Sequence, residues 1–383
     1  MNSTELNNKI MIIAGEASGD LHGAGLISAM HSIRPGIQFF GIGGDKMISA
    51  GMDAQFNAKK MAFLGFIEVL RHLPYIKKVE NTLLNKIKEE NIKTVILIDY
   101  PGFNLRFARK AKALGLKIIY YISPQVWAWG KGRVKKIREL VDKMIVVFPF
   151  EEKFYRENGV EAVYVGHPLI ERINNYPFLS KEDLCRKFNL DPVKEILLLM
   201  PGSRKHEIRK IFSESVKASI KLAEKLNMQL VVALSENIDE KILNQVYNGS
   251  GYTIVKGYTY DLMKHSKFGI IKSGTSTLEA GIIALPYIVI YSTSSITYFL
   301  GKMVVDIKNL AITNILLEEN VVEELIQNDL NEQNIISKVE NTISDTNKYM
   351  MIKHKLEKLK TILGTENASN SAAKIIIEYV NGF

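Results

Sequence analysis

The fold class of this chain is indicated by one apolar run and the turn that follows it, Ile10-Met11-Ile12-Ile13-Ala14-Gly15-Glu16-Ala17-Ser18-Gly19-Asp20. Short apolar runs rich in β-branched residues are typical of strands buried inside a parallel sheet. Glycine and other small residues then lead into a stretch with helical spacing from Leu21 to Ser32. This strand-turn-helix order predicts a βαβ unit.

The same kind of apolar run recurs along the chain in two series. The first series continues at Gln38–Ile42, Thr94–Ile98, Lys117–Ile122 and Met144–Val147, and the second comprises Glu195–Met200, Leu230–Leu234, Phe268–Ile271 and Tyr287–Tyr291. Helical stretches separate the runs, which predicts parallel sheets covered on both faces. We therefore expect an α/β protein with two Rossmann-like, doubly wound domains.

The boundary between the two series falls in residues 168–194, where prolines and asparagines interrupt the pattern. A length of 383 residues also fits two domains of roughly 150–200 residues each. We expect a first domain over residues 1–170, a second over residues 171–345, and a C-terminal helical tail over residues 346–383.

Composition and charge exclude several classes of protein. Cys185 is the single cysteine, which excludes a disulfide framework and a cysteine-rich metal site. The first residues lack the basic and apolar segments of a signal peptide, and no apolar run approaches the ~20 residues that span a bilayer. We therefore expect a soluble, cytoplasmic protein. Its formal net charge of +9 suits nucleic acid, anionic lipid or a phosphorylated substrate.

Ligands of open parallel sheets bind beyond the carboxyl ends of the strands, and the first such segment is 15–23. Its glycines permit close approach of a ligand to the backbone, and a helix N-terminus favours an anion. The segment lacks the Gly-x-Gly-x-x-Gly spacing of dinucleotide-binding proteins. It also lacks the Gly-Lys-Ser/Thr end of the Walker A phosphate-binding motif. Taken alone, the segment favours a tight turn with Ser18 or Asp20 as the helix N-cap. Glu16, however, is an unusual residue at the end of a buried strand.

Further motifs of the first half also follow strands. Asp99 comes directly after Ile98, the last residue of a predicted strand. A carboxylate at this position can serve as a general base when burial tunes its pKa. The alternative is that Asp99 caps a helix or forms a turn. Segment 123–133 holds both tryptophans together with Lys131 and Arg133. Aromatic rings can stack on a sugar while neighbouring cations bind a phosphate. The alternative is that this segment forms an amphipathic helix whose basic face is solvated. His167 lies at the predicted domain boundary, although a lone histidine is more often structural.

Two motifs of the second half follow strands and open helices. The first motif, Pro201-Gly202-Ser203-Arg204, predicts a diphosphate site. The backbone N–H groups of Gly202 and Ser203 and the guanidinium of Arg204 can all bind an anion there. In the second motif, at 273–280, small hydroxyl residues favour phosphate contacts, and Glu279 is placed to accept hydrogen bonds from a ribose. The alternative for this motif is a hydroxyl-rich N-cap with Glu279 as its reciprocal partner.

Several chemistries lack their usual motifs. The sequence has no Asp-x-Asp, no His-Glu-x-x-His and no cysteine pair, so we predict no metal site. The Gly-x-Ser-x-Gly motif, which carries the nucleophilic serine of α/β-hydrolases, is also missing from the sequence. Basic residues are scattered among acidic ones without a recognised nucleic-acid-binding module, so we expect no nucleic acid partner.

These motifs, in this order, resemble those of the lipid-A-disaccharide synthase family, which are glycosyltransferases of the GT-B fold. The resemblance runs from Ile12 to about Ile326 and rests on segments 15–20, 123–129 and 201–204 taken together, with 64–70 as a further match. It implies two Rossmann-like domains facing a cleft, and no cofactor.

The resemblance also implies a reaction in lipid A (lipopolysaccharide) biosynthesis. In it, 2,3-diacylglucosamine passes from UDP-2,3-diacylglucosamine to 2,3-diacylglucosamine 1-phosphate, giving the β-1′,6-linked disaccharide 1-phosphate and UDP. Because the donor is an α-glycosyl ester, the anomeric centre inverts, and a single displacement needs one general base. Asp99 matches the family's Asp-x-Pro-x-Phe-Asn motif and is the predicted base. Glu16 is the second choice of base, or a partner that positions the acceptor.

Binding residues are carried over in the same way. Those for UDP are Gly202, Ser203, Arg204, Ser273, Gly274, Thr275, Glu279 and Asn314, and those for the acceptor are Ser18, Asn104, Lys131, Arg133 and His167. Asn104 and His167 are expected either to orient the substrate or to support residues that contact it. Lys131 and Arg133 are expected at the acceptor 1-phosphate, and Arg204 is expected to neutralise the diphosphate in place of a metal. The last third departs from the family pattern, since Ser292 replaces a usual basic residue and Ile312-Thr313-Asn314 replaces Leu-Pro-Asn.

Both implied substrates carry acyl chains, so the enzyme must meet a membrane without spanning it. Segment 61–76 is apolar and flanked by Lys59, Lys60, Lys77 and Lys78, which predicts peripheral contact with the cytoplasmic face of the inner membrane. A helix buried in the N-terminal core is the alternative for this segment. A homodimer is also compatible with the chain. The runner-up function is a UDP-sugar 2-epimerase of the same fold.

Overall fold

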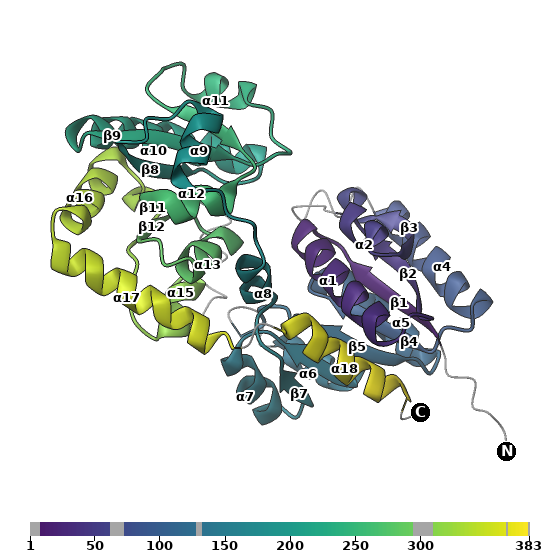
Figure 1. Ribbon diagram of the computed structural model, residues 1–383. Helices are drawn as coiled ribbons and strands as arrows, with labels where there is room; N and C mark the ends of the chain where they lie inside the picture. Colours follow the sequence, from purple (N-terminus) through teal and green to yellow (C-terminus); the bar gives the residue numbers. More distant parts are fainter. Residues whose placement is uncertain (1–7, 62–72, 128–131, 294–308, 365–366, 382–383) are drawn as a thin grey trace. The chain divides into compact units, whose positions relative to one another are not determined.

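The computed structural model describes residues 8–61, 73–127, 132–293, 309–364 and 367–381, and Figure 1 shows its elements. The chain divides into two compact units. The first comprises Met1–Glu171 and Leu363–Phe383, and the second comprises Arg172–Ile362. Each unit holds its own parallel sheet with helices on both faces, as the sequence predicts.

The sheet of the first unit has the order β3-β2-β1-β4-β5-β6-β7, and every neighbouring pair is parallel. Its strands are β1 (Lys9–Ala14), β2 (Gln38–Gly43), β3 (Met52–Asn57), β4 (Thr94–Ile98), β5 (Lys117–Tyr121), β6 (Lys143–Val146) and β7 (Ala162–Tyr164). All five residues of β4 are buried, because the central strands are covered on both sides.

Helices cover both faces of this sheet. They are α1 (Ala17–Ile33), α2 (Asp45–Ser49), α4 (Leu73–Glu89), α5 (Pro101–Ala113), α6 (Gly132–Leu140), α7 (Pro149–Glu157) and α18 (Ala368–Asn381), with a 3₁₀ turn at Ala58–Lys60. On one face, Val79 and Leu83 of α4 and Phe107 of α5 join the core beneath β1 and β4. On the other, α18 packs beside α1, although the two are far apart in sequence (Figure 1).

The second unit repeats the pattern with the order β10-β9-β8-β11-β12-β13, again all parallel. Its strands are β8 (Glu195–Met200), β9 (Met228–Leu234), β10 (Thr253–Lys256), β11 (Ser266–Lys272), β12 (Tyr287–Tyr291) and β13 (Glu324–Ile326). Its core joins Leu197 and Leu199 of β8 to Phe212 of α10 and Val339 of α16.

The helices of this unit include both long and short ones. They are α9 (Lys181–Phe188), α10 (Lys205–Lys225), α11 (Lys241–Val246), α12 (Thr259–His265), α13 (Thr275–Ile282), α15 (Ile312–Leu317), α16 (Glu332–Ile343) and α17 (Thr346–Ile362), with a 3₁₀ turn at Gln327–Asp329. Helix α8 (Pro168–Asn174) contains the boundary between the units, since the first unit ends at Glu171.

The C-terminal region differs from the predicted separate tail. It forms two helices, α17 in the second unit and α18 in the first. Between them, Gly364 has a φ of +78°, and a Cβ there would lie 2.9 Å from the Tyr164 hydroxyl oxygen. Only glycine tolerates both conditions, so the chain turns here and leads into α18, which buries Ala372 and Ile376.

The predicted apolar segment 61–76 is described only at its ends. Met61 is fully buried, and Ile76 joins the same core through α4. Residues 62–72, including the family-like segment 64–70, lie outside the described residues. Among the helices that are described, none is long and apolar enough to cross a membrane.

Candidate functional site

Each sheet brings two of the predicted motifs to its topological switch point. In the first unit the strand order reverses between β1 and β4, and these strands lead directly into Gly15-Glu16 and Asp99-Tyr100. In the second unit it reverses between β8 and β11, which lead into 201–204 and 273–275. Open α/β sheets bind ligands at such points, beyond the carboxyl ends of the strands.

The loop after β4 has a strained backbone at Asp99. Asp99 and Tyr100 are consecutive left-handed residues with φ of +43° and +46°, and the neighbouring Ile122 has a φ of +60°. Such conformations cost about 1–3 kcal/mol each for residues other than glycine and collect at functional sites. Asp99 therefore holds its position only because its surroundings impose it.

Hydrogen bonds to the backbone hold this strained loop in place. The amide of Asn104 donates to the carbonyl oxygens of Ile98 and Asp99, at 3.2 and 2.7 Å. The Tyr120 hydroxyl also donates to the Asp99 carbonyl, and the Asp99 N–H donates to the Ile122 carbonyl at 3.2 Å. Asn104 is fully buried, and its amide holds the backbone of Asp99, so any effect on the acceptor acts through that residue.

The Asp99 carboxyl has an unusual protonation equilibrium. Burial, together with the nearby negative charge of Glu16, raises its pKa from 3.8 to about 6. A carboxylate with a pKa near the working pH is suited to general-base chemistry, which favours this role over that of a turn residue. The structure thus brings together both predicted catalytic residues, Asp99 and Glu16.

The turn after β1 differs from the simple N-cap interpretation. Glu16, rather than Ser18 or Asp20, occupies the N-cap position of α1, and it makes no side-chain cap hydrogen bond. Asp20 instead accepts hydrogen bonds from the backbone N–H groups of Gly44, Lys46 and Met47, at 2.7–3.2 Å. Ser18 is partly exposed in the first turn of α1.

Gly15 is required by the packing between the two loops. A Cβ at this position would lie 2.3 Å from the ring of Tyr100. The Tyr100 hydroxyl donates to the Met61 carbonyl at 2.7 Å, which fixes the ring over Gly15. The glycine therefore serves the loop that carries Asp99.

The segment with the tryptophans is anchored by a carboxylate that sequence reasoning missed. Glu151, buried in α7, accepts hydrogen bonds from the Ser123 hydroxyl at 2.5 Å and from the Trp127 indole at 3.0 Å. It also accepts from the backbone N–H of Phe148 at 3.2 Å. Burial outweighs these hydrogen bonds and raises the pKa of Glu151 from 4.5 to about 7.

The other predicted acceptor residues have different outcomes. Arg133 lies in the first turn of α6, whereas Lys131 is outside the described residues. His167 is buried, and its Nδ1 accepts a hydrogen bond from the Leu169 N–H at 3.2 Å. Burial and the nearby His22 lower the pKa of His167 to about 3. A neutral, buried ring that caps the start of α8 is a structural histidine.

In the second unit, Arg204 is the N-cap residue of α10, and its side chain is 43% exposed. The Ser203 N–H, which we predicted to face a diphosphate, donates to Glu207 Oε2 at 3.1 Å. Gly202 has a φ of +115°, and a Cβ there would lie 2.6 Å from the same carboxylate oxygen. Glu207 also accepts a hydrogen bond from the Lys272 Nζ at 2.7 Å, and sequence reasoning gave neither residue a role.

Glu279 has a different partner from the one the N-cap interpretation requires. The N-cap of α13 is Gly274, without a side-chain cap hydrogen bond. The Tyr260 hydroxyl donates to Glu279 Oε1 at 2.9 Å, and burial raises the pKa of Glu279. Ser273 and Thr275 flank Gly274 at this helix start, as predicted.

Asn314 is a structural residue in this arrangement. Its amide nitrogen donates to the Val322 carbonyl and to Glu324, and its amide oxygen accepts from the N–H groups of Val321 and Val322, all at 2.8–3.0 Å. The residue is 1% exposed, and these four hydrogen bonds fill the capacity of its amide within the protein. The predicted contact of Asn314 with UDP therefore has no support in the geometry.

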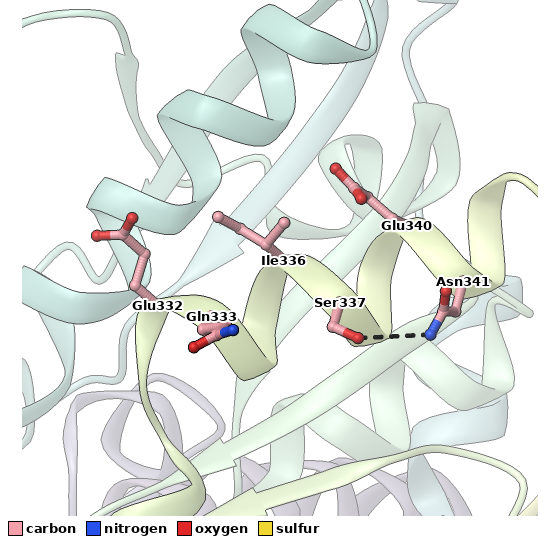
Figure 2. Close-up of a pocket in the computed structure, with 6 residues that line it drawn as sticks. All are labelled: Glu332, Gln333, Ile336, Ser337, Glu340 and Asn341. Carbon is pink, nitrogen blue, oxygen red and sulfur yellow. Dashed lines mark hydrogen bonds between the residues drawn. The ribbon is translucent and has the colours of Figure 1, made fainter.

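Figure 2 shows a pocket away from the switch points, on α16. It is lined by Glu332, Gln333, Ile336, Ser337, Glu340 and Asn341. Glu332 and Glu340 form ion pairs with Lys221 and Lys225 of α10, so their charges serve the contact between the two helices. None of the predicted site residues lines it. Among the residues described, no three His, Cys, Asp or Glu side chains are placed to hold a metal ion.

The sequence matches a known family over nearly its whole length. The model of the family described as lipid-A-disaccharide synthetase matches residues 10–380. A lipid-A-disaccharide synthase from Geobacter sulfurreducens is 39% identical, covering 97% of each chain. Enzymes of the same name from Myxococcus xanthus and Coxiella burnetii are 36% and 37% identical, each over 97% of this chain and 97% and 98% of their own.

Solved structures with the same fold have much lower identity. A Staphylococcus aureus MnaA structure with UDP aligns with a TM-score of 0.68 at 15% identity, over 98% of this chain and 97% of that one. The calicheamicin glycosyltransferase CalG4 aligns with a TM-score of 0.62 at 13% identity, over 98% of both chains. The predicted GT-B class, with two Rossmann-like units, is confirmed. By its family match and its relatives, the chain belongs to the lipid-A-disaccharide synthase family of glycosyltransferases.

Proposed function

We propose that this enzyme transfers 2,3-diacylglucosamine from UDP-2,3-diacylglucosamine to the 6-hydroxyl of 2,3-diacylglucosamine 1-phosphate. The products are the β-1′,6-linked disaccharide 1-phosphate and UDP, with inversion at the anomeric carbon. The family and the names of its relatives support synthesis of a lipid A disaccharide. The acylated substrates and the stereochemistry are part of this proposal.

In the proposed mechanism, one displacement forms the new bond. The acceptor 6-oxygen attacks the anomeric carbon while Asp99 takes its proton, and the bond to the diphosphate oxygen breaks with its electron pair leaving on UDP. Glu16 keeps the pKa of Asp99 high enough for it to hold that proton. Arg204 stabilises the charge on the departing UDP, a task for a cationic side chain rather than a metal ion.

One observation carries this proposal. At the switch point of the first sheet, a carboxyl group with a pKa of about 6 is held on a strained backbone beside a second carboxylate. Strain and a raised pKa both lower stability, so their combination at the strand ends favours a chemical role. We assign the acceptor to this unit, with Arg133 and Lys131 at its 1-phosphate.

The donor is assigned to the second unit. Arg204 and the starts of α10 and α13 suit a diphosphate, since helix N-termini favour anions. Glu279, held by Tyr260, is assigned to the ribose hydroxyls. A nucleoside diphosphate site in this unit is shared by the main proposal and by its competitor, a UDP-sugar 2-epimerase.

The epimerase alternative rests on fold alone. A Neisseria meningitidis UDP-GlcNAc 2-epimerase structure bound to UDP-GlcNAc aligns with a TM-score of 0.67, but at 14% identity over 98% of this chain and all of that one. The relatives at 36–39% identity are named synthases instead. We therefore rank transfer above epimerisation.

The direct test of the proposed base is Asp99→Ala. Removing the proton acceptor should lower the rate of disaccharide formation by about 10²–10⁴-fold, a typical contribution of general-base catalysis. UDP affinity, which belongs to the other unit, should change little. Near-normal turnover of this variant would remove Asp99 from the mechanism, whereas loss of UDP binding as well would indicate a structural defect.

A further inference from the structure

A lysine that neither the motifs nor the proposed mechanism includes lies at the switch point of the second sheet. Lys272 is the last residue of β11, the strand that pairs with β8. Its side chain is 16% exposed, and its Nζ donates to Glu207 Oε1 at 2.7 Å. The same Nζ lies 4.0 Å from where a Cβ on Gly274 would be and 5.7 Å from the centroid of the Tyr291 ring. Lys272 therefore stands between the starts of α10 and α13.

Glu207 gathers two cations onto one carboxylate oxygen. Arg204 Nη1 lies 3.7 Å from Glu207 Oε1, the oxygen that Lys272 also contacts. The other oxygen accepts the Ser203 N–H. Burial by itself raises the pKa of Glu207, but the hydrogen bond and charge of Lys272 outweigh it and hold the pKa below its ordinary value. Glu207 is thus ionised, and the three side chains together retain one positive charge.

Lys272 keeps part of its hydrogen-bonding capacity for a ligand. A lysine ammonium has three donors, and Lys272 gives one of them to Glu207. Lys272 and Arg204 both lie beside the single negative charge of Glu207, so these three side chains together carry a net positive charge that attracts an anion. A diphosphate group is such an anion, and Gly274 leaves space for it beside Lys272, because an added Cβ there would lie 4.0 Å from the Lys272 Nζ.

We infer that Lys272 is a further contact for the diphosphate of the UDP-sugar and that Glu207 positions it beside Arg204, an assignment that rests on the proposed function. As the bond from the anomeric carbon to the β-phosphate oxygen breaks, its electron pair leaves on that oxygen. Lys272 stabilises the charge that develops there, while the proton of the acceptor hydroxyl goes to Asp99. Lys272 is therefore a residue of binding and of leaving-group stabilisation.

The test is titration of the full-length protein with UDP, UMP and uridine by calorimetry. Lys272→Met should weaken UDP about tenfold or more, because a charge-assisted contact is lost. Uridine affinity should stay within about twofold, and Lys272→Arg should restore most of the UDP affinity. Lys210→Met removes an exposed lysine of α10, the helix that carries Glu207, and should change neither affinity. If Lys272→Met does not fold, Lys272→Gln, which keeps a donor for Glu207, takes its place.

The outcomes separate this inference from the proposed function. If the wild type binds UDP and Lys272→Met binds it equally well, the inference is overturned while the proposed function stands. Equal losses of UDP and uridine would show Lys272 to be a purely structural partner of Glu207, which also overturns it. Failure of the wild type to bind UDP would overturn both. A loss confined to the phosphorylated ligands, with rescue by Lys272→Arg, supports the assignment.

Discussion

At the residue scale, Asp99 and Glu16 share one chemical environment although 83 positions separate them in the sequence. Their strands, β1 and β4, are neighbours in register, with Ala14 opposite Ile98. Burial disfavours ionisation of Asp99, and the negative charge of Glu16 adds to this effect. Asp99 is therefore suited to accepting a proton near pH 6.

The raised pKa predicts the pH dependence of transfer. Asp99 must be ionised to accept a proton, so kcat/KM should fall about tenfold per pH unit below about pH 6. Glu16→Gln removes the negative charge that raises this pKa, so its acid limb should move to lower pH. The measurement is kcat/KM between about pH 4.5 and pH 8 for both proteins. An acid limb at the same pH in Glu16→Gln would contradict the coupling, and complete loss of transfer would make Glu16 the base.

The sequence indicated these two carboxylates because both lie just after apolar strands. Lys272 also directly follows an apolar run, Phe268–Ile271, but sequence reasoning gave it no role. Glu151, Glu207 and Tyr260 do not follow a strand in this way. Glu207 and Lys272 are 65 positions apart, and Ser123 and Glu151 are 28 apart, so only the tertiary structure joins them. Asn314 shows the reverse case: the motif suggested a ligand contact, whereas the structure shows its side chain bonded to its own loop.

At the element scale, burial decides which strands could be predicted. Every strand expected from an apolar run is present, with bounds that differ by at most a few residues. The strands that were not predicted, β3, β7, β10 and β13, are the edge strands of the two described sheets. Edge strands are covered less fully and mix polar with apolar residues, as in Met52-Asp53-Ala54-Gln55-Phe56-Asn57 of β3.

The loop at 123–127 depends on a single side chain of another element, Glu151 in α7. Glu151→Ala would leave the Ser123 hydroxyl, the Trp127 indole and the Phe148 N–H without their acceptor. Stranding buried donors in this way should lower the free energy of unfolding by about 2–4 kcal/mol. The melting temperature should then fall by about 5–15 °C.

The neighbouring Glu152 provides a matched control on the same helix. It forms an i,i+4 ion pair with Arg156, whose side chain is 61% exposed, so Glu152→Ala should cost less than about 1 kcal/mol. Thermal unfolding of the wild type and both variants makes the comparison. Equal melting temperatures for Glu151→Ala and Glu152→Ala would show that the loop does not depend on Glu151.

At the scale of the whole molecule, the net charge of +9 now has proposed partners. Arg204 and Lys272 are assigned to the diphosphate, and Arg133 to a sugar phosphate. Lys77 and Lys78 are exposed at the start of α4 and are proposed to contact anionic headgroups. The charge thus fits a phosphorylated lipid substrate at a bilayer surface.

The membrane proposal predicts binding that depends on lipid charge. The full-length protein should sediment with vesicles that contain phosphatidylglycerol and be released at about 0.5 M salt, because screening weakens surface electrostatics. The double variant Lys77→Glu/Lys78→Glu should bind more weakly than Lys210→Glu/Lys241→Glu, which changes the same charge at exposed lysines of the second unit. Equal binding to vesicles of phosphatidylcholine alone would contradict an electrostatic contact.

The central claim is that this chain joins two acylated glucosamines through a UDP-activated donor. The most direct measurement is a transfer assay with purified protein, UDP-2,3-diacylglucosamine and radiolabelled 2,3-diacylglucosamine 1-phosphate, with parallel incubation of UDP-N-acetylglucosamine. We predict that label moves into a β-1′,6-linked disaccharide 1-phosphate with release of UDP, and that UDP-N-acetylglucosamine is unchanged. Formation of the 2-epimer of UDP-N-acetylglucosamine without any labelled disaccharide would contradict the account.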